Sequence, residues 1–105
     1  MIQIELKDYT LTAKGHAEYD KEKGKDIVCA AVSTLICTLV DSLNGLDFGM
    51  EDGSLNANLL DGDAFVTCKP KPEYEANVQM AYWTILNGLK MVADSYPENV
   101  TLMTP

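Results

Sequence analysis

The sequence predicts an α+β domain in which two helices pack on a β-sheet built from hairpins, with the element order ββαββα(β). Three observations support this fold class. The chain opens with alternating apolar residues, two later segments repeat apolar residues at helical spacing, and an Asp-Gly pair separates two further alternating segments. The 105 residues, 47% of them hydrophobic, suffice for one core but not for two. We therefore expect a single domain over residues 1–105.

The first expected element is a β-hairpin that leads the chain to Gly15-His16. Its apolar residues alternate with polar ones on both sides of a break at Lys7-Asp8: Ile2, Ile4, Leu6, Tyr9, Leu11 and Ala13. The following residues, 17–25, are rich in charge and include Gly24. This composition predicts a flexible loop over 17–25.

The first helix is expected to begin after Asp26, a residue type that often caps helix N-termini. Apolar residues then form one stripe at about 100° per residue. The stripe consists of Val28, Val32, Leu35, Ile36, Leu39 and Leu43. Asn44-Gly45 supplies the expected end of this helix.

The second half of the chain predicts a hairpin, a long helix and a short strand. The hairpin covers residues 54–69 and turns at Asp61-Gly62, a pair preferred in type I′ turns. With that register, one face carries Leu55, Ala57, Leu59, Ala64, Val66 and Cys68. The helix is expected from Pro72 to Tyr96, and residues 100–103 form a possible edge strand.

Composition excludes several classes of function. The net charge of −8 argues against a nucleic-acid-binding surface, which needs clustered Lys and Arg. An acidic chain can instead attract a basic polypeptide, although surplus acidic residues more often serve solubility. The start of the chain lacks the continuous apolar stretch of a signal peptide. The apolar tract 27–40 is interrupted by polar residues and is shorter than the ~20 residues that cross a bilayer. We therefore expect a cytoplasmic protein without membrane contact.

The three cysteines Cys29, Cys37 and Cys68 cannot all pair within the chain, and their spacing matches no zinc site. Free thiols in a reducing cytoplasm fit this pattern, and we expect neither a metal nor a cofactor. Cys37 and Cys68 are interpreted as structural residues. Met80 and Trp83 lie off the main apolar stripe of the second helix, and we interpret them as core residues in preference to a subunit contact.

Cys29 is the candidate nucleophile. It lies in the first turn of the predicted helix, where free backbone N–H groups and the helix dipole favour a thiolate. A small buried hydrophobic residue is the alternative interpretation. His16 is the only histidine, so a mechanism that uses an imidazole must use this residue. It could accept the proton of the thiol and later protonate the leaving amine, although a lone histidine is more often an ordinary surface residue.

Two further residues could support the pair. Asp26 is first a helix cap, and it could also orient the imidazole in the manner of a Ser-His-Asp triad. Ser33 could donate a hydrogen bond near the site, but a bond to a helix carbonyl is the commoner role of such a serine. Asp47-Phe48-Gly49 matches a kinase motif by chance, since no phosphate loop accompanies it. Asp61 and Asp63 lack the remaining ligands of a calcium loop and are interpreted as turn residues.

These residues also carry a family likeness. The segment Gly15-His16-Ala17, then Gly24, then residues 26–33 (Asp-Ile-Val-Cys-Ala-Ala-Val-Ser) resemble the signature of the ribosomal-processing cysteine proteases, the Prp family. The likeness extends over nearly the whole chain, from the opening hairpin to Tyr96-Pro97. The segment from Glu18 to Lys25 is about one residue longer than is usual in that family.

The resemblance implies an endopeptidase that removes a short N-terminal extension from a large-subunit ribosomal protein, the one numbered twenty-seven. It implies that His16 and Cys29 are catalytic and that Asp26 and Ser33 occupy the positions of the motif acid and serine. It also implies a homodimer in which a mobile loop covers the cleft. Two alternatives remain open from the sequence: a non-catalytic peptide-binding or ribosome-assembly module of the same fold, and a protease of phage structural proteins.

Overall fold

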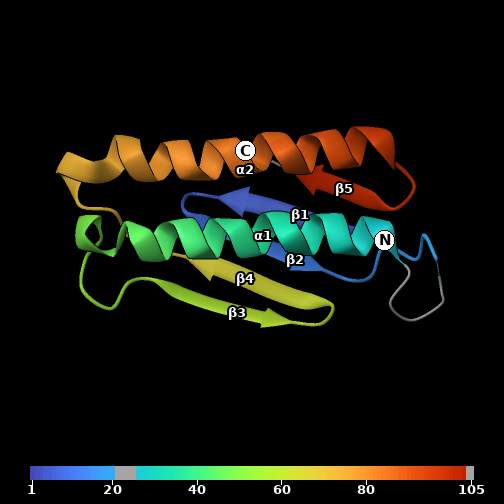
Figure 1. Ribbon diagram of the computed structural model, residues 1–105, viewed down its shortest axis with the longest axis horizontal. Helices are drawn as coiled ribbons and strands as arrows, with labels where there is room; N and C mark the ends of the chain where they lie inside the picture. The colour runs from blue at the N-terminus through green and yellow to red at the C-terminus, as the bar shows by residue number, and fades with distance from the viewer. Residues whose placement is uncertain (21–25, 104–105) are drawn as a thin grey trace.

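Two helices lie side by side across one face of a five-stranded sheet in the computed structural model, which describes residues 1–20 and 26–103 (Figure 1). The elements are β1 (Ile2–Lys7), β2 (Thr10–Lys14), α1 (Ile27–Gly45), η1 (Asp47–Gly49), β3 (Asn56–Leu60), β4 (Asp63–Thr67), η2 (Pro72–Tyr74), α2 (Glu75–Ser95) and β5 (Val100–Met103). The strand order is β3-β4-β2-β1-β5. Only the β1–β5 pair among these strands is parallel. The predicted α+β fold is confirmed.

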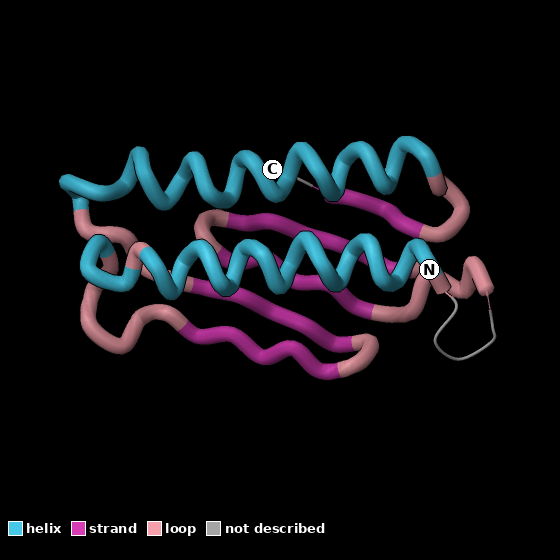
Figure 2. The backbone as a smooth tube through the Cα atoms, viewed as in Figure 1, coloured by secondary structure: helices cyan, strands magenta, loops and turns pink. Residues whose placement is uncertain are grey.

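The opening hairpin has the predicted alternation. Ile4 pairs with Ala13, and Leu6 pairs with Leu11, so the apolar residues of both strands share one face. Ile2, Ile4, Leu11 and Ala13 are buried beneath the helices, whereas Gln3, Glu5 and Lys14 are exposed on the opposite face. The sheet therefore has one face in the core and one face in water, as is common for antiparallel sheets. Figure 2 shows the helices in one layer and the strands in the other.

Helix α1 begins at Ile27 with Asp26 as its N-cap and ends at Gly45, as the sequence predicts. Its buried stripe consists of Val28, Val32, Ile36, Leu39 and Leu43. The helix has 19 residues and a mean hydropathy of 1.8, so by length and composition alone it could cross a membrane. The apolar tract 27–40, which by its length is too short to cross a bilayer, is thus only part of the longer helix α1. Its buried stripe packs in the core of the domain, and core helices of this kind also meet those two criteria.

The second hairpin turns at Asp61-Gly62, and Leu60 pairs with Asp63 across the turn, which confirms the predicted register. The predicted type I′ turn is wrong. Such a turn needs a positive φ at both central residues, and here φ is positive at Gly62 (75°) but not at Asp61. Strand β3 forms the sheet edge and is exposed along its whole length, because it lies beyond the cover of α1 (Figure 1).

Four details depart from the expectations. The predicted helix from Pro72 is divided into η2 and α2, and the sequence did not predict η1. Met80 and Trp83 are 62% and 59% exposed, so they are not core residues. Their positions on α2 point away from the sheet, since the stripe that α2 buries is Val78, Tyr82, Ile85 and Leu89. Cys68 is buried as expected, but Cys37 is exposed.

Candidate active site

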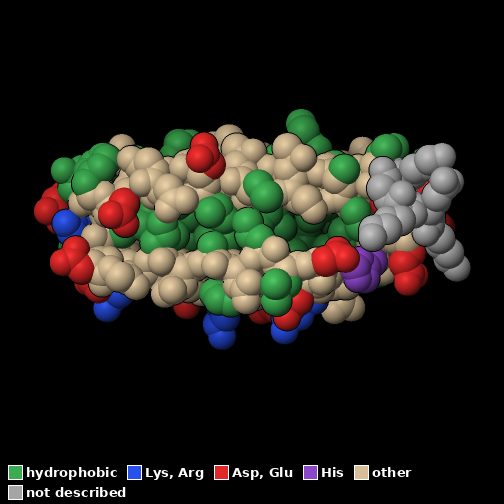
Figure 3. All heavy atoms as spheres, turned by 60° about the horizontal axis from the view of Figure 1, so that its bottom comes forward, with side chains coloured by type: hydrophobic (Ala, Val, Ile, Leu, Met, Phe, Trp, Pro, Cys, Tyr) green, Lys and Arg blue, Asp and Glu red, His purple; other side chains and the backbone are tan. Residues whose placement is uncertain are grey.

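A groove runs between α1 and the hairpin of β3 and β4. Its volume is about 320 Å³. In Figure 3, hydrophobic side chains line a trough along the molecule, and the histidine stands at one end of it. The lining residues come from α1, from the β3–β4 hairpin and from the end of β2, and include Cys29, Val32, Ile36, Leu59, Ala64 and His16. The trough is open and apolar and runs along the molecule, a shape that can hold an extended chain.

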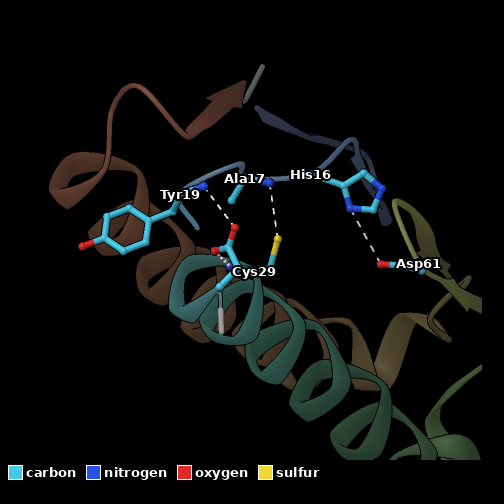
Figure 4. A network of polar contacts seen from close by, with 6 residues as sticks. His16, Ala17, Tyr19, Cys29 and Asp61 are labelled. Carbon is cyan, nitrogen blue, oxygen red and sulfur yellow. Dashed lines mark hydrogen bonds and ion pairs between the residues drawn. The ribbon is translucent and has the colours of Figure 1, made fainter. Parts of the chain in front are cut away.

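Cys29 lies in the first turn of α1 and is half-buried at the groove. Its sulfur accepts a hydrogen bond from the backbone N–H of Ala17, with an N–Sγ distance of 3.3 Å. Figure 4 shows the thiol directed toward Ala17 across the start of the helix. A hydrogen-bond donor and a helix N-terminus both favour negative charge on a sulfur. Cys29 lies in the first turn of the helix, as the sequence predicts, and its role as nucleophile stays a prediction.

Asp26 holds together the start of α1 and the segment that precedes it. Its Oδ1 accepts the N–H groups of Val28 and Cys29 at 3.0 and 2.9 Å, and its Oδ2 accepts those of Tyr19 and Asp20 at 3.0 and 3.3 Å. Burial by itself raises the pKa of this carboxyl. The four backbone hydrogen bonds outweigh burial and hold the pKa of Asp26 below its ordinary value.

His16 is placed by the pairing of β2 with β4. Lys14 pairs with Asp63, and the next residue, Gly15, donates its N–H to the carbonyl oxygen of Gly62 at 2.9 Å. Gly15 has a φ of 97°, and a Cβ at this position would collide with the carbonyl of Met1. Glycine is therefore required here for the chain to turn toward the site.

The imidazole of His16 rests on the β3–β4 turn. A Cβ on Gly62 would lie 2.6 Å from Nε2 of His16, so the ring occupies space that only glycine leaves free. Nδ1 of His16 lies 3.8 Å from Oδ1 of Asp61. In Figure 4 the ring faces Asp61 while the thiol of Cys29 faces Ala17. Among the described residues, no hydrogen bond joins His16 to Cys29.

In the described chain, neither of the two proposed supporting residues, Asp26 and Ser33, forms a hydrogen bond with His16. The hydrogen bonds described for Asp26 go to backbone N–H groups, so it does not orient His16 here. Ser33 lines the groove and is exposed, and no hydrogen bond of its hydroxyl is found in the described chain, so the expected bond to a helix carbonyl is absent there. Gly24 and most of the predicted loop 17–25 lie outside the described residues. The described part of that loop includes Ala17, which is 1% exposed.

Sequence reasoning missed several residues of the site. Asp61 and Gly62 face His16, Asn99 binds the carbonyl of Ala17, and Cys37 lines the groove two turns along α1 from Cys29. The sequence predicted both hairpins, but it did not predict that β2 pairs with β4. This pairing brings the Asp61-Gly62 turn beside His16. Over the described ranges 1–20 and 26–103, no group of three or more His, Cys, Asp or Glu residues could hold a metal ion.

A thiol at a helix N-terminus, a backbone donor directed at its sulfur and an apolar trough for an extended chain are features of a thiol-dependent hydrolase that acts on polypeptides. The family model described as cysteine protease Prp matches residues 1–101. The chain belongs to this family of cysteine proteases.

Relatives and solved structures agree with this membership. The chain is 35% identical over 102 residues to the ribosomal processing cysteine protease Prp of Mycoplasma genitalium, a match that covers 97% of this chain and 94% of the relative. It is similar to a crystal structure of a Streptococcus mutans protein, with 31% identity, a TM-score of 0.69 and coverage of 100% and 96% of the two chains.

The fold is also that of the essential ribosomal processing protease Prp of S. aureus, crystallised with a covalently linked product peptide. That match has a TM-score of 0.76 and 24% identity, and it covers 99% of this chain and 97% of the other. A second crystal structure of the S. aureus protease contains a substrate peptide and has a TM-score of 0.70.

Proposed function

We propose that this cysteine protease removes a short N-terminal extension from a large-subunit ribosomal protein, the one numbered twenty-seven, with Cys29 as nucleophile and His16 as general base. The name of the Mycoplasma relative, a ribosomal processing protease, supports a ribosomal substrate. The bound peptides of the S. aureus protease support a peptide ligand. The acidic chain, with a net charge of −8, suits a basic ribosomal partner.

The observation that carries this proposal is the position of Cys29 at the groove, with its sulfur facing a backbone N–H. Cys37 lines the same groove eight residues further along α1. At ~1.5 Å per helical residue this is about 12 Å, the length of roughly three to four residues of an extended peptide. The groove therefore accommodates a short extended segment beside the scissile bond, and its apolar lining favours apolar side chains in that segment.

The reaction begins with proton transfer from the Cys29 thiol to the imidazole of His16. The thiolate attacks the carbonyl carbon of the scissile bond, and the imidazolium then protonates the leaving amine as the C–N bond breaks. This leaves the acyl part of the substrate bound to Cys29 as a thioester. The imidazole then takes a proton from water, the hydroxyl attacks the thioester carbon, and the C–S bond breaks as the imidazolium returns the proton to the sulfur. His16 faces Asp61 in this structure, so its ring turns toward the groove for the proton transfers. An exposed side chain such as that of His16 can make this rotation readily.

The enzyme is further proposed to work in the cytoplasm as a homodimer. Three free cysteines support a reducing compartment. The exposed Met80, Trp83 and Met91 on α2 support contact with a second copy, since large apolar side chains that cluster on one helix face often mark an interface. Sedimentation of the purified chain tests the dimer, and a monomer at all concentrations contradicts it.

The function is tested by incubating the chain with a peptide that covers the extended N-terminus of the organism's own ribosomal protein twenty-seven. Mass spectrometry should show one cut near the extension boundary, and no cut in Cys29→Ala or Cys29→Ser. Cys68→Ala is the matched control, because Cys68 is buried away from the groove and its loss affects mainly stability. Cleavage by folded Cys29→Ala contradicts the assignment of the nucleophile.

The role of His16 has its own test. His16→Ala should lower the cleavage rate by at least the ~10²-fold that general acid–base help supplies. It should also lower the rate at which Cys29 is alkylated near neutral pH. If the dependence of that alkylation on pH is the same in His16→Ala and the native chain, the two residues do not act as a pair.

A further inference from the structure

We propose that Asn99 is a positioning residue of the active site, which acts through Ala17 to keep a backbone N–H directed at the sulfur of Cys29. This inference deepens the proposed function and depends on the assignment of Cys29 as nucleophile. Asn99 lies in the turn between α2 and β5, far from Cys29 in the sequence. It is not itself a groove residue, and its side chain binds Ala17 and not the thiol, so its effect on the sulfur is indirect.

Two hydrogen bonds connect Asn99 to the thiol. Nδ2 of Asn99 donates to the carbonyl oxygen of Ala17 at 2.9 Å. The N–H of the same Ala17 donates to Sγ of Cys29 at 3.3 Å. Ala17 is thus held at its carbonyl by one residue and presents its N–H to the other. Its side chain is 1% exposed, so the residue is also fixed by packing in the core.

Two backbone hydrogen bonds fix the backbone of Asn99 and thereby the position from which its side chain extends. Its N–H donates to the carbonyl of Tyr96 at 2.9 Å, and its carbonyl accepts the N–H of Ile2 at 2.8 Å. The next residue, Val100, is 2% exposed and begins β5. These contacts involve backbone atoms or the neighbouring residue. A substitution at Asn99 therefore removes the bond to Ala17 and leaves the turn itself in place.

The segment that Asn99 holds needs such a restraint. Residues 16–18 belong to no helix or strand. Glu18 has a φ of 57°, a left-handed conformation that is unfavourable for a residue with a side chain. On the far side of Glu18, the N–H of Tyr19 is bound by Asp26. Within the described chain, Asn99 provides the hydrogen bond to the Ala17 carbonyl, so the strained residue is held between two fixed ones.

The chemical consequence concerns the charge on the sulfur. A directed N–H donor stabilises a thiolate more than a neutral thiol, because hydrogen bonds to charged acceptors are the stronger ones. When Asn99 no longer holds the carbonyl of Ala17, the N–H samples other directions. The sulfur then loses a donor that stabilises its negative charge. The substitution should move the pH dependence of thiol reactivity and leave the intrinsic reactivity of the thiolate unchanged.

The experiment measures alkylation of Cys29 by iodoacetamide from pH 5 to 10, with the modified site resolved by mass spectrometry in the full chain. Asn99→Ala removes the side chain. Asn99→Asp keeps its shape but cannot donate a hydrogen bond when ionised. We expect both variants to react about three- to tenfold more slowly at pH 7 and to reach the native rate at high pH. Asn58→Asp is the control for added charge, because Asn58 is exposed on β3 and is not a groove residue.

Each outcome separates the inference from the proposed function. An unchanged profile in folded Asn99→Asp or Asn99→Ala overturns the role of Asn99, while cleavage by the native chain still supports Cys29. An equal shift in Asn58→Asp also overturns it, because the effect would then be one of charge alone. If Cys29 of the native chain is unreactive and the peptide is not cut, the proposed function fails instead. Should Asn99→Ala not fold, the isosteric Asn99→Asp provides the measurement.

Discussion

Nδ1 of His16 lies 3.8 Å from Oδ1 of Asp61, while the sulfur of Cys29 faces Ala17 and not the imidazole. The side chains of His16 and Asp61 are 56% and 97% exposed. An ion pair between such exposed groups contributes little, about 0–1 kcal/mol, and requires a protonated imidazole. The ring can therefore leave Asp61 at small cost and turn to the groove when a peptide occupies it.

The first prediction concerns this contact. Asp61→Asn should change kcat/KM by no more than about fivefold, because the lost interaction is worth at most about 1 kcal/mol in water. Measurement of kcat/KM at low and at high salt checks this, since screening should remove even the small difference. A loss of about a hundredfold would instead make Asp61 the third catalytic residue.

The second prediction concerns the glycine beneath the imidazole. Gly62→Ala should cost about 1 kcal/mol of stability, because φ is 75° at this position. It should also change activity, because the new Cβ would lie 2.6 Å from Nε2 of His16 and displace the ring from the position that it occupies in this structure. Gly53→Ala is the matched control: its φ is 70°, and a Cβ there meets nothing within 4 Å. Both variants should lose similar stability, and equal activity in the two would contradict the effect on His16.

The third prediction tests the groove as the peptide site. Cys37→Trp adds bulk at an exposed position of the groove wall without touching the start of α1. It should raise KM for the peptide substrate by about tenfold or more, because the extended chain loses its place along α1. Alkylation of Cys29 by a small reagent should be unchanged. Native KM in this variant would show that the peptide lies elsewhere.

The fourth prediction concerns Asp26 and pH. The pKa of Asp26 is lowered in the folded chain, so its contribution is present at pH values above the unfolded pKa and is lost as the pH falls through the folded pKa. At pH 7, Asp26→Ala should lower the free energy of unfolding by about 1–2 kcal/mol through loss of the helix cap.

The pH series decides this point. The difference in unfolding free energy between the native chain and Asp26→Ala should shrink below about pH 4, where the carboxyl takes up a proton in the unfolded chain. Urea denaturation at several pH values measures it. A difference that stays constant down to pH 2 would mean that the charge of Asp26 contributes nothing.

Much of the fold was accessible from the sequence because local patterns determine it. Asp26 before an apolar stripe predicted the start of α1, and the Asp61-Gly62 pair predicted both the hairpin and its register. The first turn of a helix is a local feature, so the position of Cys29 was also predictable. The exposure of Trp83 was not, because periodicity places it on a face of α2 without showing that no other element covers that face.

The neighbours of the thiol and the imidazole could not be predicted, because they depend on contacts between distant segments. Gly62 reaches His16 only through the pairing of β2 with β4, and Asn99 reaches Ala17 only because β5 lies beside β1. An Asn in a turn and a Gly after an Asp carry no local signal of such roles. The turn type at Asp61-Gly62 was mispredicted for a different reason: this dipeptide is compatible with more than one turn type.

The parallel pairing of β1 with β5 has a consequence for the order of events during synthesis. A nascent chain leaves the ribosome from its N-terminus, so β1, β2 and α1 emerge long before Asn99 and β5. Cys29 and Ala17 can meet early, but the carbonyl of Ala17 receives its hydrogen bond only when β5 has docked beside β1. The surroundings of the thiol are therefore completed only after Asn99 and β5 have left the ribosome, and a nascent chain that still lacks them does not yet hold Ala17 against Cys29 in this way.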